Sequence, residues 1–199
     1  MQIRITGSKA HLLYTYYKGT RDDWPKKCQS MVFSKFIGTD DTNYGIEHEK
    51  DAIEIFRRRF PHLEVESDLG FILNAACPMF GYSPDGLTCD NNGKRCLIEV
   101  KCPAKGKKFD GVDLCNQLNY LQCGDDGRFT LKKRHLYYSQ IQFGLSLLKL
   151  DLCYLLIYSE KSESIVVIEV PFELEYCKTL ILCFVLSTFF VYQAMRSLF

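Results

Sequence analysis

The sequence carries almost no net charge. Its 25 lysines and arginines nearly balance 24 aspartates and glutamates, so the formal net charge of the 199-residue chain is +1. A uniformly positive surface is therefore excluded, and local groups of basic side chains would have to attract a polyanionic partner. Three such groups are present, at 57–59, 105–108 and 132–134. Each is equally consistent with a solvated face, and the pattern alone does not separate the two interpretations.

The ten cysteines include no Cys-x-x-Cys pair and no pair followed by a suitably spaced second pair or by two histidines. This pattern argues against a structural zinc site. The first 17 residues contain no uninterrupted apolar core, so no signal peptide is predicted. Cys96, Cys102 and Cys153 fall in predicted strands, where small apolar residues would serve. We therefore expect reduced thiols in an intracellular protein, with a disulfide framework as the less favoured alternative.

The 17 residues from Thr179 to Met195 contain no charged side chain. A membrane-spanning helix needs about 20 predominantly apolar residues, and Ser187, Thr188 and Gln193 dilute this run. We therefore expect a closing helix that packs on a sheet, and no association with a membrane. An exposed apolar side of this helix, used for self-association, is a further alternative.

The composition is ordinary for a globular protein, with 47% hydrophobic and 25% charged residues. A chain of this length can bury a substantial core as a single domain, 1–199. Residues 1–40 are predicted to form a helical N-terminal region, and 41–199 the core. The core contains in order a helix, a strand hairpin, a helix, a second hairpin and a final helix. This order predicts an α/β fold, a central mixed β-sheet flanked by helices on both faces.

Residues 81–103 are the most informative stretch. Asn91-Asn92-Gly93 is a turn signal, because asparagine and glycine accept positive φ at little cost. The chain should therefore double back into a strand over 96–102, whose side chains alternate between two faces. One face is apolar, and Glu99 and Lys101 lie together on the other.

Asp85 lies in a Pro-Asp-Gly turn at the far end of this hairpin, where it can return to the neighbourhood of Glu99. Two carboxylates and the amine of Lys101 would then converge at the edge of a sheet. Carboxylate oxygens suit a hard divalent cation, and such a cation can activate an attacking water. The hairpin therefore predicts a site for metal-assisted hydrolysis.

A helix is predicted over about 42–59, with Ile46, Ile53 and Phe56 as its apolar stripe. Glu49 falls on the same stripe, where a carboxylate is costly unless it is paired or bound to a metal. The pattern alone favours a salt-bridged helix residue over a metal ligand.

Two pentapeptides of the hairpin carry a resemblance to a known family. They are Ser83-Pro84-Asp85-Gly86-Leu87 and Glu99-Val100-Lys101-Cys102-Pro103. Together they resemble the lambda exonuclease or YqaJ-type viral recombinase branch of the PD-(D/E)XK nuclease superfamily. A bare P-D and E-x-K arises often by chance, whereas two longer segments in this order and spacing are much more specific. The resemblance implies a restriction-endonuclease-like core.

The resemblance also implies roles for individual residues. Asp85, Glu99 and the Val100 carbonyl would hold Mg²⁺, or alternatively Mn²⁺, and Lys101 would orient or deprotonate the attacking water. The segment 45–49 is similar to the family's Gly-x-x-x-Glu, which implies that Glu49 completes the metal site.

Two further segments are similar to family motifs. Residues 137–142 resemble Tyr-x-x-Gln-Val-Gln, which implies that Gln142 positions the nucleophile near the lysine. Residues 4–8 are similar to Arg-Ile-Thr-Ala-Ser, which implies that Ser8 lies by a DNA 5′-phosphate, although spacing alone favours a plain helix N-cap. The family's upstream arginine and tryptophan would fall at or before Met1. We therefore expect either a piece of a longer protein or a reduced phosphate pocket.

Residues 104–133 contain several glycines and are predicted to form a long polar loop beside the site. The residues of this loop that we expect to contact DNA are Lys105, Lys107 and Lys108.

By resemblance, the protein would be a Mg²⁺-dependent exonuclease acting 5′-to-3′ on double-stranded DNA in recombination and repair. The resemblance further implies a ring-shaped trimer and a partner that anneals single strands. Two alternatives remain: a catalytically silent DNA-binding or assembly module, and a structure-specific endonuclease with the same core.

Overall fold

The computed structural model describes residues 5–19, 23–24, 26–27 and 40–196. Its centre is a five-stranded sheet in the order β10-β9-β6-β5-β2. The strands are β2 (Glu64–Ser67), β5 (Gly86–Cys89), β6 (Arg95–Lys101), β9 (Leu152–Ser159) and β10 (Ser164–Pro171). Within this sheet β6 and β9 run parallel, and the other neighbouring pairs are antiparallel. The predicted mixed sheet is therefore confirmed.

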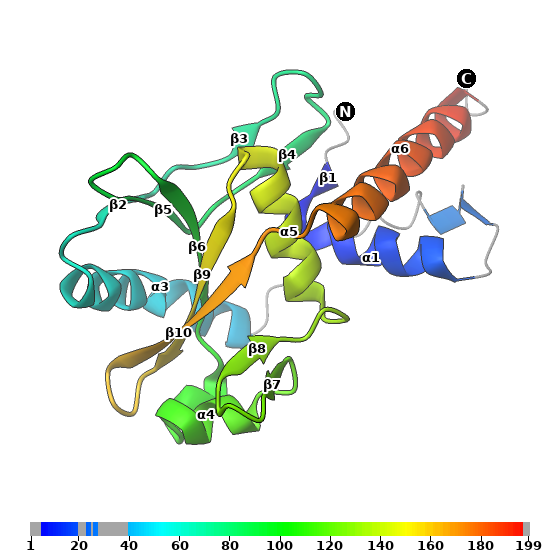
Figure 1. Ribbon diagram of the computed structural model, residues 1–199. Helices are drawn as coiled ribbons and strands as arrows, with labels where there is room; N and C mark the ends of the chain where they lie inside the picture. Colours follow the sequence, from blue (N-terminus) through cyan, green and yellow to red (C-terminus); the bar gives the residue numbers. More distant parts are fainter. Residues whose placement is uncertain (1–4, 20–22, 25, 28–39, 197–199) are drawn as a thin grey trace.

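Helices cover both faces of the sheet (Figure 1). On one face lies α3 (Asp40–Arg59), whose Ile53 and Phe56 are buried in a cluster with Ile98 of β6. The helix predicted over 42–59 is thus confirmed. Ile46, which we placed on the same apolar stripe, is instead 66% exposed because it lines a cleft.

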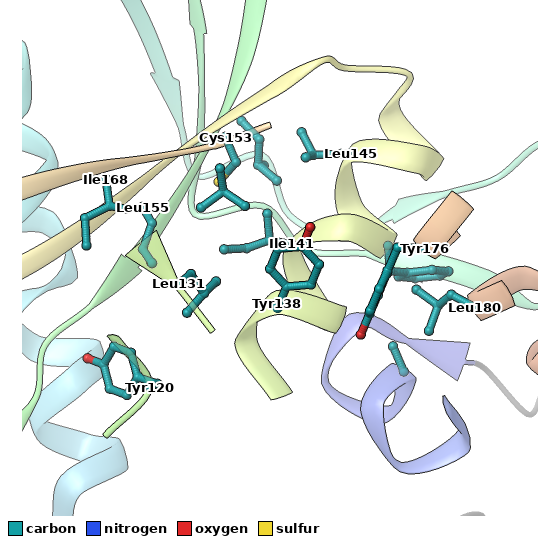
Figure 2. Packing of buried hydrophobic residues seen from close by; sticks show 14 of the residues in the cluster. Tyr120, Leu131, Tyr138, Ile141, Leu145, Cys153, Leu155, Ile168, Tyr176 and Leu180 are labelled. Atoms are coloured by element: carbon teal, nitrogen blue, oxygen red, sulfur yellow. The ribbon is translucent and has the colours of Figure 1, made fainter. Parts of the chain in front are cut away.

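On the other face lies α5 (Leu136–Leu148), whose Ile141 and Leu145 belong to the larger hydrophobic cluster (Figure 2). Two more helices, α1 (Gly7–Lys18) and α6 (Leu174–Arg196), pack against α5 and against each other. The predicted arrangement of helices on both faces of a mixed sheet is confirmed.

Strand β6 is buried on both sides, because it pairs with β5 and β9 and has a helix over each face. Its side chains alternate as predicted, so Leu97 joins the α5 cluster and Ile98 joins the α3 cluster. Glu99 therefore points into the α5 side of the molecule and is only 1% exposed.

The β5–β6 hairpin turns where the Asn-Asn-Gly signal predicts. Gly93 has a φ of 78°, a conformation that costs glycine little. The Asp90 side chain accepts hydrogen bonds from the backbone N–H groups of Asn92 and Lys94, at 2.9 and 2.8 Å. This tight turn fixes the register that pairs Gly86 with Ile98.

A second, three-stranded sheet anchors the start of the described chain. It is formed by β1 (Ile5–Thr6), β4 (Phe80–Tyr82) and β3 (Ile72–Leu73). Strand β1 runs parallel to β4, and α1 starts directly after it. Thr6 is the N-cap of α1 but makes no side-chain cap hydrogen bond. Of the predicted helical N-terminal region, residues 1–4, 20–22, 25 and 28–39 lie outside the described residues.

The prediction of a long loop over 104–133 is wrong. The segment contains a 3₁₀ turn η1 (Ala104–Lys107), helix α4 (Gly111–Gln117) and a hairpin of β7 (Leu121–Cys123) and β8 (Phe129–Leu131). Several of its apolar side chains, such as Leu114, Leu118 and Leu121, are buried in the α5 cluster. Burial of these scattered residues orders a stretch that its glycines made look irregular.

The C-terminal half follows the prediction closely. Strands β9 and β10 form the expected hairpin, and the expected final helix is present as α6. It packs mainly against α1 and α5, however, and not on the central sheet as predicted. None of the described helices combines the length and the hydropathy that a membrane span requires. Cys96 and Cys153 are buried free thiols in strands, whereas Cys102 lies just past the end of β6.

Candidate active site

A cleft of about 700 Å³ opens at the end of β6. Its lining comes from α3, the β5–β6 hairpin with the segment that follows it, residues 117–120 and the start of α5. The predicted site residues that line the cleft are Glu49, Asp85, Glu99, Val100, Lys101 and Lys105. Residues distant in the sequence thus meet in one concave surface, as is usual for a binding site.

Asp85 lies directly before β5 and reaches across the hairpin to β6. Its Oδ2 accepts a hydrogen bond of 2.6 Å from the backbone N–H of Val100. This bond holds the Asp85 carboxylate beside Glu99, the next residue back along β6. The structure therefore brings together the two carboxylates of the hairpin.

Glu99 is held by three donors. Its carboxylate accepts hydrogen bonds from the Tyr82 hydroxyl and the Lys101 amine, each at 2.6 Å, and from the side-chain amide of Gln140. Polar networks in which every member is satisfied are rigid when buried. The orientation of the Glu99 carboxylate is therefore fixed by protein groups alone.

The carboxylates of the cleft are crowded. Burial, followed by the charge of Glu99, raises the pKa of Asp85 well above its ordinary value, and the same two causes raise the pKa of Glu49. Burial alone would lower the pKa of Lys101, but the carboxylates of Glu99 and Asp85 raise it above its ordinary value. One ammonium therefore faces three acidic groups, and an added cation would relieve their repulsion.

The donor set fits a hard divalent cation. Mg²⁺ and Mn²⁺ prefer oxygen ligands, and Mg²⁺ is usually held by one or two carboxylates together with waters and substrate phosphates. Asp85 and Glu99 supply two carboxylates in an open cleft. In the described part of the chain, no three His, Cys, Asp or Glu side chains lie close enough to hold an ion between them. Glu49 thus lines the cleft without forming a three-carboxylate cage.

Gln142 does not lie in the cleft. Its side chain is fully buried, donates to the carbonyl of Pro171 at 2.7 Å and accepts from the N–H of Glu173 at 2.8 Å. Gln140 reaches the Glu99 carboxylate in its place. The expected placement of Gln142 is wrong because residues two apart on a helix point about 200° apart, and here Gln140 is on the cleft side.

Tyr82 and Tyr137 were also missed by sequence reasoning. The Tyr82 ring is wedged against two helices so closely that a Cβ atom added to Gly7 or Gly144 would come within 2.8 Å or 2.5 Å of it. The Tyr137 ring lies 4.6 Å from the Lys101 amine, a cation–π distance. The signal for Tyr82 was its place in β4, just before the Ser-Pro-Asp turn.

Ser8 lies in the first turn of α1 and is exposed. Its hydroxyl is 3.0 Å from that of Thr6. Gly7, its neighbour, packs against Tyr82 and Gln140, both of which contact Glu99. Ser8 itself does not line the cleft.

Of the three lysines predicted to contact DNA, one lines the cleft and two lie outside it. Lys105 lines the cleft and donates to the carbonyl of Gln117 at 2.6 Å. Lys107 lies over the Tyr44 ring at 4.3 Å, and Lys108 is exposed. Neither Lys107 nor Lys108 lines the cleft.

The other two basic groups make contacts within the fold. Arg57 donates to Val65 and Ser67, and Arg59 donates to the carbonyl of Ile165. In the group at 132–134, Lys132 donates to the carbonyl of Asn119. These contacts support structural roles for the side chains concerned.

The comparisons with solved structures agree with this architecture. LHK-Exo, an alkaline exonuclease from Laribacter hongkongensis crystallised with dAMP, superposes with a TM-score of 0.66 at 18% identity, covering 98% of this chain and 89% of that one. A phage-related exonuclease from Haemophilus somnus 129PT gives a TM-score of 0.68 at 13% identity, covering 100% and 98%.

A third structure is a complex of SOX with DNA, with a TM-score of 0.59 at 12% identity, covering 98% of this chain and 66% of that one. SOX is the shutoff and exonuclease protein of Kaposi's sarcoma-associated herpesvirus. At these identities the likeness establishes a shared fold.

A search of curated protein sequences found no match. The model of the YqaJ-like viral recombinase domain matches residues 2–147. Because this match spans well over half of the 199 residues, the chain belongs to the YqaJ-like viral recombinase domain family.

Proposed function

We propose that this protein is a metal-dependent deoxyribonuclease that degrades duplex DNA from its ends, 5′ to 3′, in recombination and repair. The observation that carries the proposal is the convergence of Asp85, Glu99 and Lys101 in one cleft at the end of β6. Family membership supports it. So do solved neighbours of the same fold, one an alkaline exonuclease bound to dAMP and another bound to DNA.

Asp85, Glu99 and the Val100 carbonyl are the groups that would hold Mg²⁺ or Mn²⁺, with Glu49 supporting the ion directly or through water. When bound, such an ion polarises the scissile phosphate and lowers the pKa of a bound water. Burial and the charge of Glu99 raise the pKa of both Asp85 and Glu49, and a bound cation would favour their charged forms.

The remaining roles belong to side chains that need no metal. Lys101 is held as an ammonium by the neighbouring carboxylates, so it donates hydrogen bonds and stabilises negative charge on a phosphate in the cleft. Gln140, which lines the cleft, and the buried Tyr82 fix the Glu99 carboxylate. The protein thus supplies a preorganised charged site.

The test is cleavage of linear, nicked and closed circular duplex DNA by the purified protein with Mg²⁺, with EDTA as the control. Separate 5′ and 3′ end labels report the direction. An RNA substrate is included, because one structural neighbour of the same fold is an RNA complex of SOX.

Mononucleotides released from DNA ends only, starting at the 5′ label, would support the proposal. Cuts in closed circles would instead identify an endonuclease. Binding without cleavage would identify a silent module, and cleavage of RNA alone would overturn the choice of substrate.

We also propose, from the family resemblance, a ring-shaped trimer and an annealing partner for the exposed single strand. Light scattering on the purified protein gives the mass directly. A monomer at all concentrations would exclude the trimer.

A further inference from the structure

Tyr120 has a buried hydroxyl without a partner. The residue is 7% exposed, and its hydroxyl oxygen has no hydrogen-bond partner among the described protein groups. In Figure 2 the hydroxyl points away from the rest of the hydrophobic cluster. A buried hydroxyl that stays unpaired is destabilising, so its persistence calls for an explanation.

Three buried hydroxyls in the described part of the chain lack a partner: those of Tyr44, Thr88 and Tyr120. Of the three residues, Tyr120 lines the proposed active-site cleft, and the other two do not. The unpaired group therefore coincides with the place where a substrate would bind.

The Tyr120 ring is held rigidly. Its backbone carbonyl accepts a hydrogen bond of 2.9 Å from the N–H of Lys132. The ring packs edge-on against Tyr137, with centroids 5.0 Å apart, and against His135 at 5.2 Å. Because the ring is already ordered, little side-chain conformational entropy is lost when a ligand accepts a hydrogen bond from its hydroxyl.

Toward an anionic ligand, the protonated Tyr120 hydroxyl can act only as a hydrogen-bond donor. Burial raises the pKa of Tyr120 well above its ordinary value, so the group stays protonated at physiological pH. Lys105 also lines the cleft and contributes a positive charge to it. Tyr137 joins this wall to the catalytic end, since its ring contacts both Tyr120 and the Lys101 amine.

We propose that Tyr120 donates a hydrogen bond to a non-bridging oxygen of a phosphodiester next to the scissile one, and so positions the DNA strand along this wall of the cleft. The inference rests on the proposed nuclease function and adds a second, non-catalytic phosphate contact to the same site. An anionic oxygen is the ligand that the geometry favours, because a neutral fixed donor and a lysine line the wall while the acidic groups belong to β5, β6 and α3.

The test compares Tyr120→Phe with Tyr44→Phe, which removes another buried tyrosine hydroxyl at a residue that does not line the cleft. Binding to a fluorescent linear duplex is measured by anisotropy with Ca²⁺ in place of Mg²⁺, so that turnover does not intervene. Tyr120→Phe should weaken binding about tenfold or more, since hydrogen bonds to charged groups contribute about 1.5–3 kcal/mol. Tyr44→Phe should leave binding unchanged.

Thermal unfolding separates a substrate contact from a structural one. Without DNA, Tyr120→Phe should unfold at the same temperature as the wild type or slightly higher, because the substitution removes an unpaired buried hydroxyl. A clear drop in unfolding temperature together with unchanged DNA binding would overturn the proposal.

Single methylphosphonate linkages locate the contact. Each linkage flanking the scissile one is made neutral in turn, and the loss of affinity is compared between wild type and Tyr120→Phe. The wild type should be most sensitive at one linkage, and the variant should lose that sensitivity. Equal sensitivity of both proteins at every linkage would overturn the proposal. If the wild type binds DNA but does not cut it with Mg²⁺, only the proposed nuclease function is refuted. If the wild type binds no DNA, both the nuclease function and the Tyr120 contact are refuted.

Discussion

Helix α5 separates two polar regions with opposite character. On one side is the cleft, where Gln140 contacts the Glu99 carboxylate. On the other is the junction between β10 and α6, where Gln142 bridges the carbonyl of Pro171 and the N–H of Glu173. The two glutamines are two residues apart, yet one serves a charged cleft and the other closes the fold.

The carboxyl groups of the two regions shift in opposite directions. Hydrogen bonds from Lys133 and then Tyr138 lower the pKa of Glu173 in the junction. Burial and the charge of Glu99 raise the pKa of Asp85 in the cleft. In the junction the single carboxylate of Glu173 has a lysine and a tyrosine as partners, whereas in the cleft one lysine faces three carboxyl groups. The first arrangement stabilises the fold, and the second leaves room for a ligand.

The largest effect should come from Asp85→Asn. Turnover should fall at least about a thousandfold, because a bound metal supplies several kcal/mol of charge stabilisation. The fold should survive, since the asparagine oxygen can still accept from the Val100 N–H. Nuclease assays with saturating Mg²⁺ measure the turnover. If the variant kept wild-type turnover, the assignment of Asp85 to the active site would be wrong.

The same variant should be more stable than the wild type when no metal is present. A carboxyl whose pKa is raised in the fold opposes folding at pH values above its unfolded pKa of about 3.9. At pH 7 Asp85→Asn should therefore unfold a few °C higher, for a gain of about 1 kcal/mol. The gain should vanish near pH 3, where both side chains are neutral. Calorimetry without and with Mg²⁺ measures it, and a lower unfolding temperature at pH 7 without metal would contradict the comparison.

Lys101→Met should reduce turnover about a hundred- to a thousandfold, the usual cost of removing one donor to a developing charge. It should also destabilise the metal-free protein by about 3 kcal/mol, because Glu99 loses its ion-pair partner in a buried setting. Mg²⁺ should restore more stability to this variant than to the wild type. Lys94→Met, at the exposed hairpin turn, is the control for loss of a lysine. An equal loss in both variants would argue against a specific role for Lys101.

The paired variants Gln140→Leu and Gln142→Leu test the comparison directly. Gln140→Leu should lower turnover about 10- to 100-fold, the range seen when a group that orients a metal ligand is removed. Its stability should change little, because Glu99 keeps two other donors. Gln142→Leu should leave turnover per folded molecule unchanged.

Stability gives the opposite order for this pair. Gln142→Leu removes the side-chain partner of the Pro171 carbonyl and of the Glu173 N–H, and each lost hydrogen bond contributes about 0.5–1.5 kcal/mol. Denaturant unfolding measures the loss for both variants. If Gln142→Leu impaired catalysis and left stability unchanged, the roles assigned to Gln140 and Gln142 would be wrong.

The sequence predicted those parts of the fold that depend on local rules. Asn91-Asn92-Gly93 predicted the hairpin, period-two alternation predicted the two faces of β6, and the pentapeptides identified Asp85 and Glu99. Strand β1 was missed because two residues are too few to show a period. The elements of 104–133 were missed because their order comes from burial of scattered leucines against distant elements.

The choice between Gln140 and Gln142 shows what a motif leaves open. Helical spacing places the two on different sides of α5, but only the packing of α5 between the sheet and α6 decides which side meets the cleft. Glu99 shows the same limit. Alternation placed it opposite Ile98, and only the pairing of β6 between β5 and β9 makes its carboxylate buried and dependent on Tyr82.

The smallest effect should come from Glu173→Gln in the junction, and its sign should oppose that of Asp85→Asn. A carboxyl whose pKa is lowered stabilises the fold above its unfolded pKa of about 4.3 and loses this contribution as pH falls through the folded pKa. Because Glu173 is partly exposed, solvent screening limits the loss at pH 7 to less than about 1 kcal/mol. The difference from wild type should shrink as the pH falls below about 4.3 and disappear once the pH is below the lowered pKa of Glu173. Unfolding temperatures across this pH range provide the measurement, and a gain in stability at pH 7 would mean that the junction, like the cleft, holds uncompensated charge.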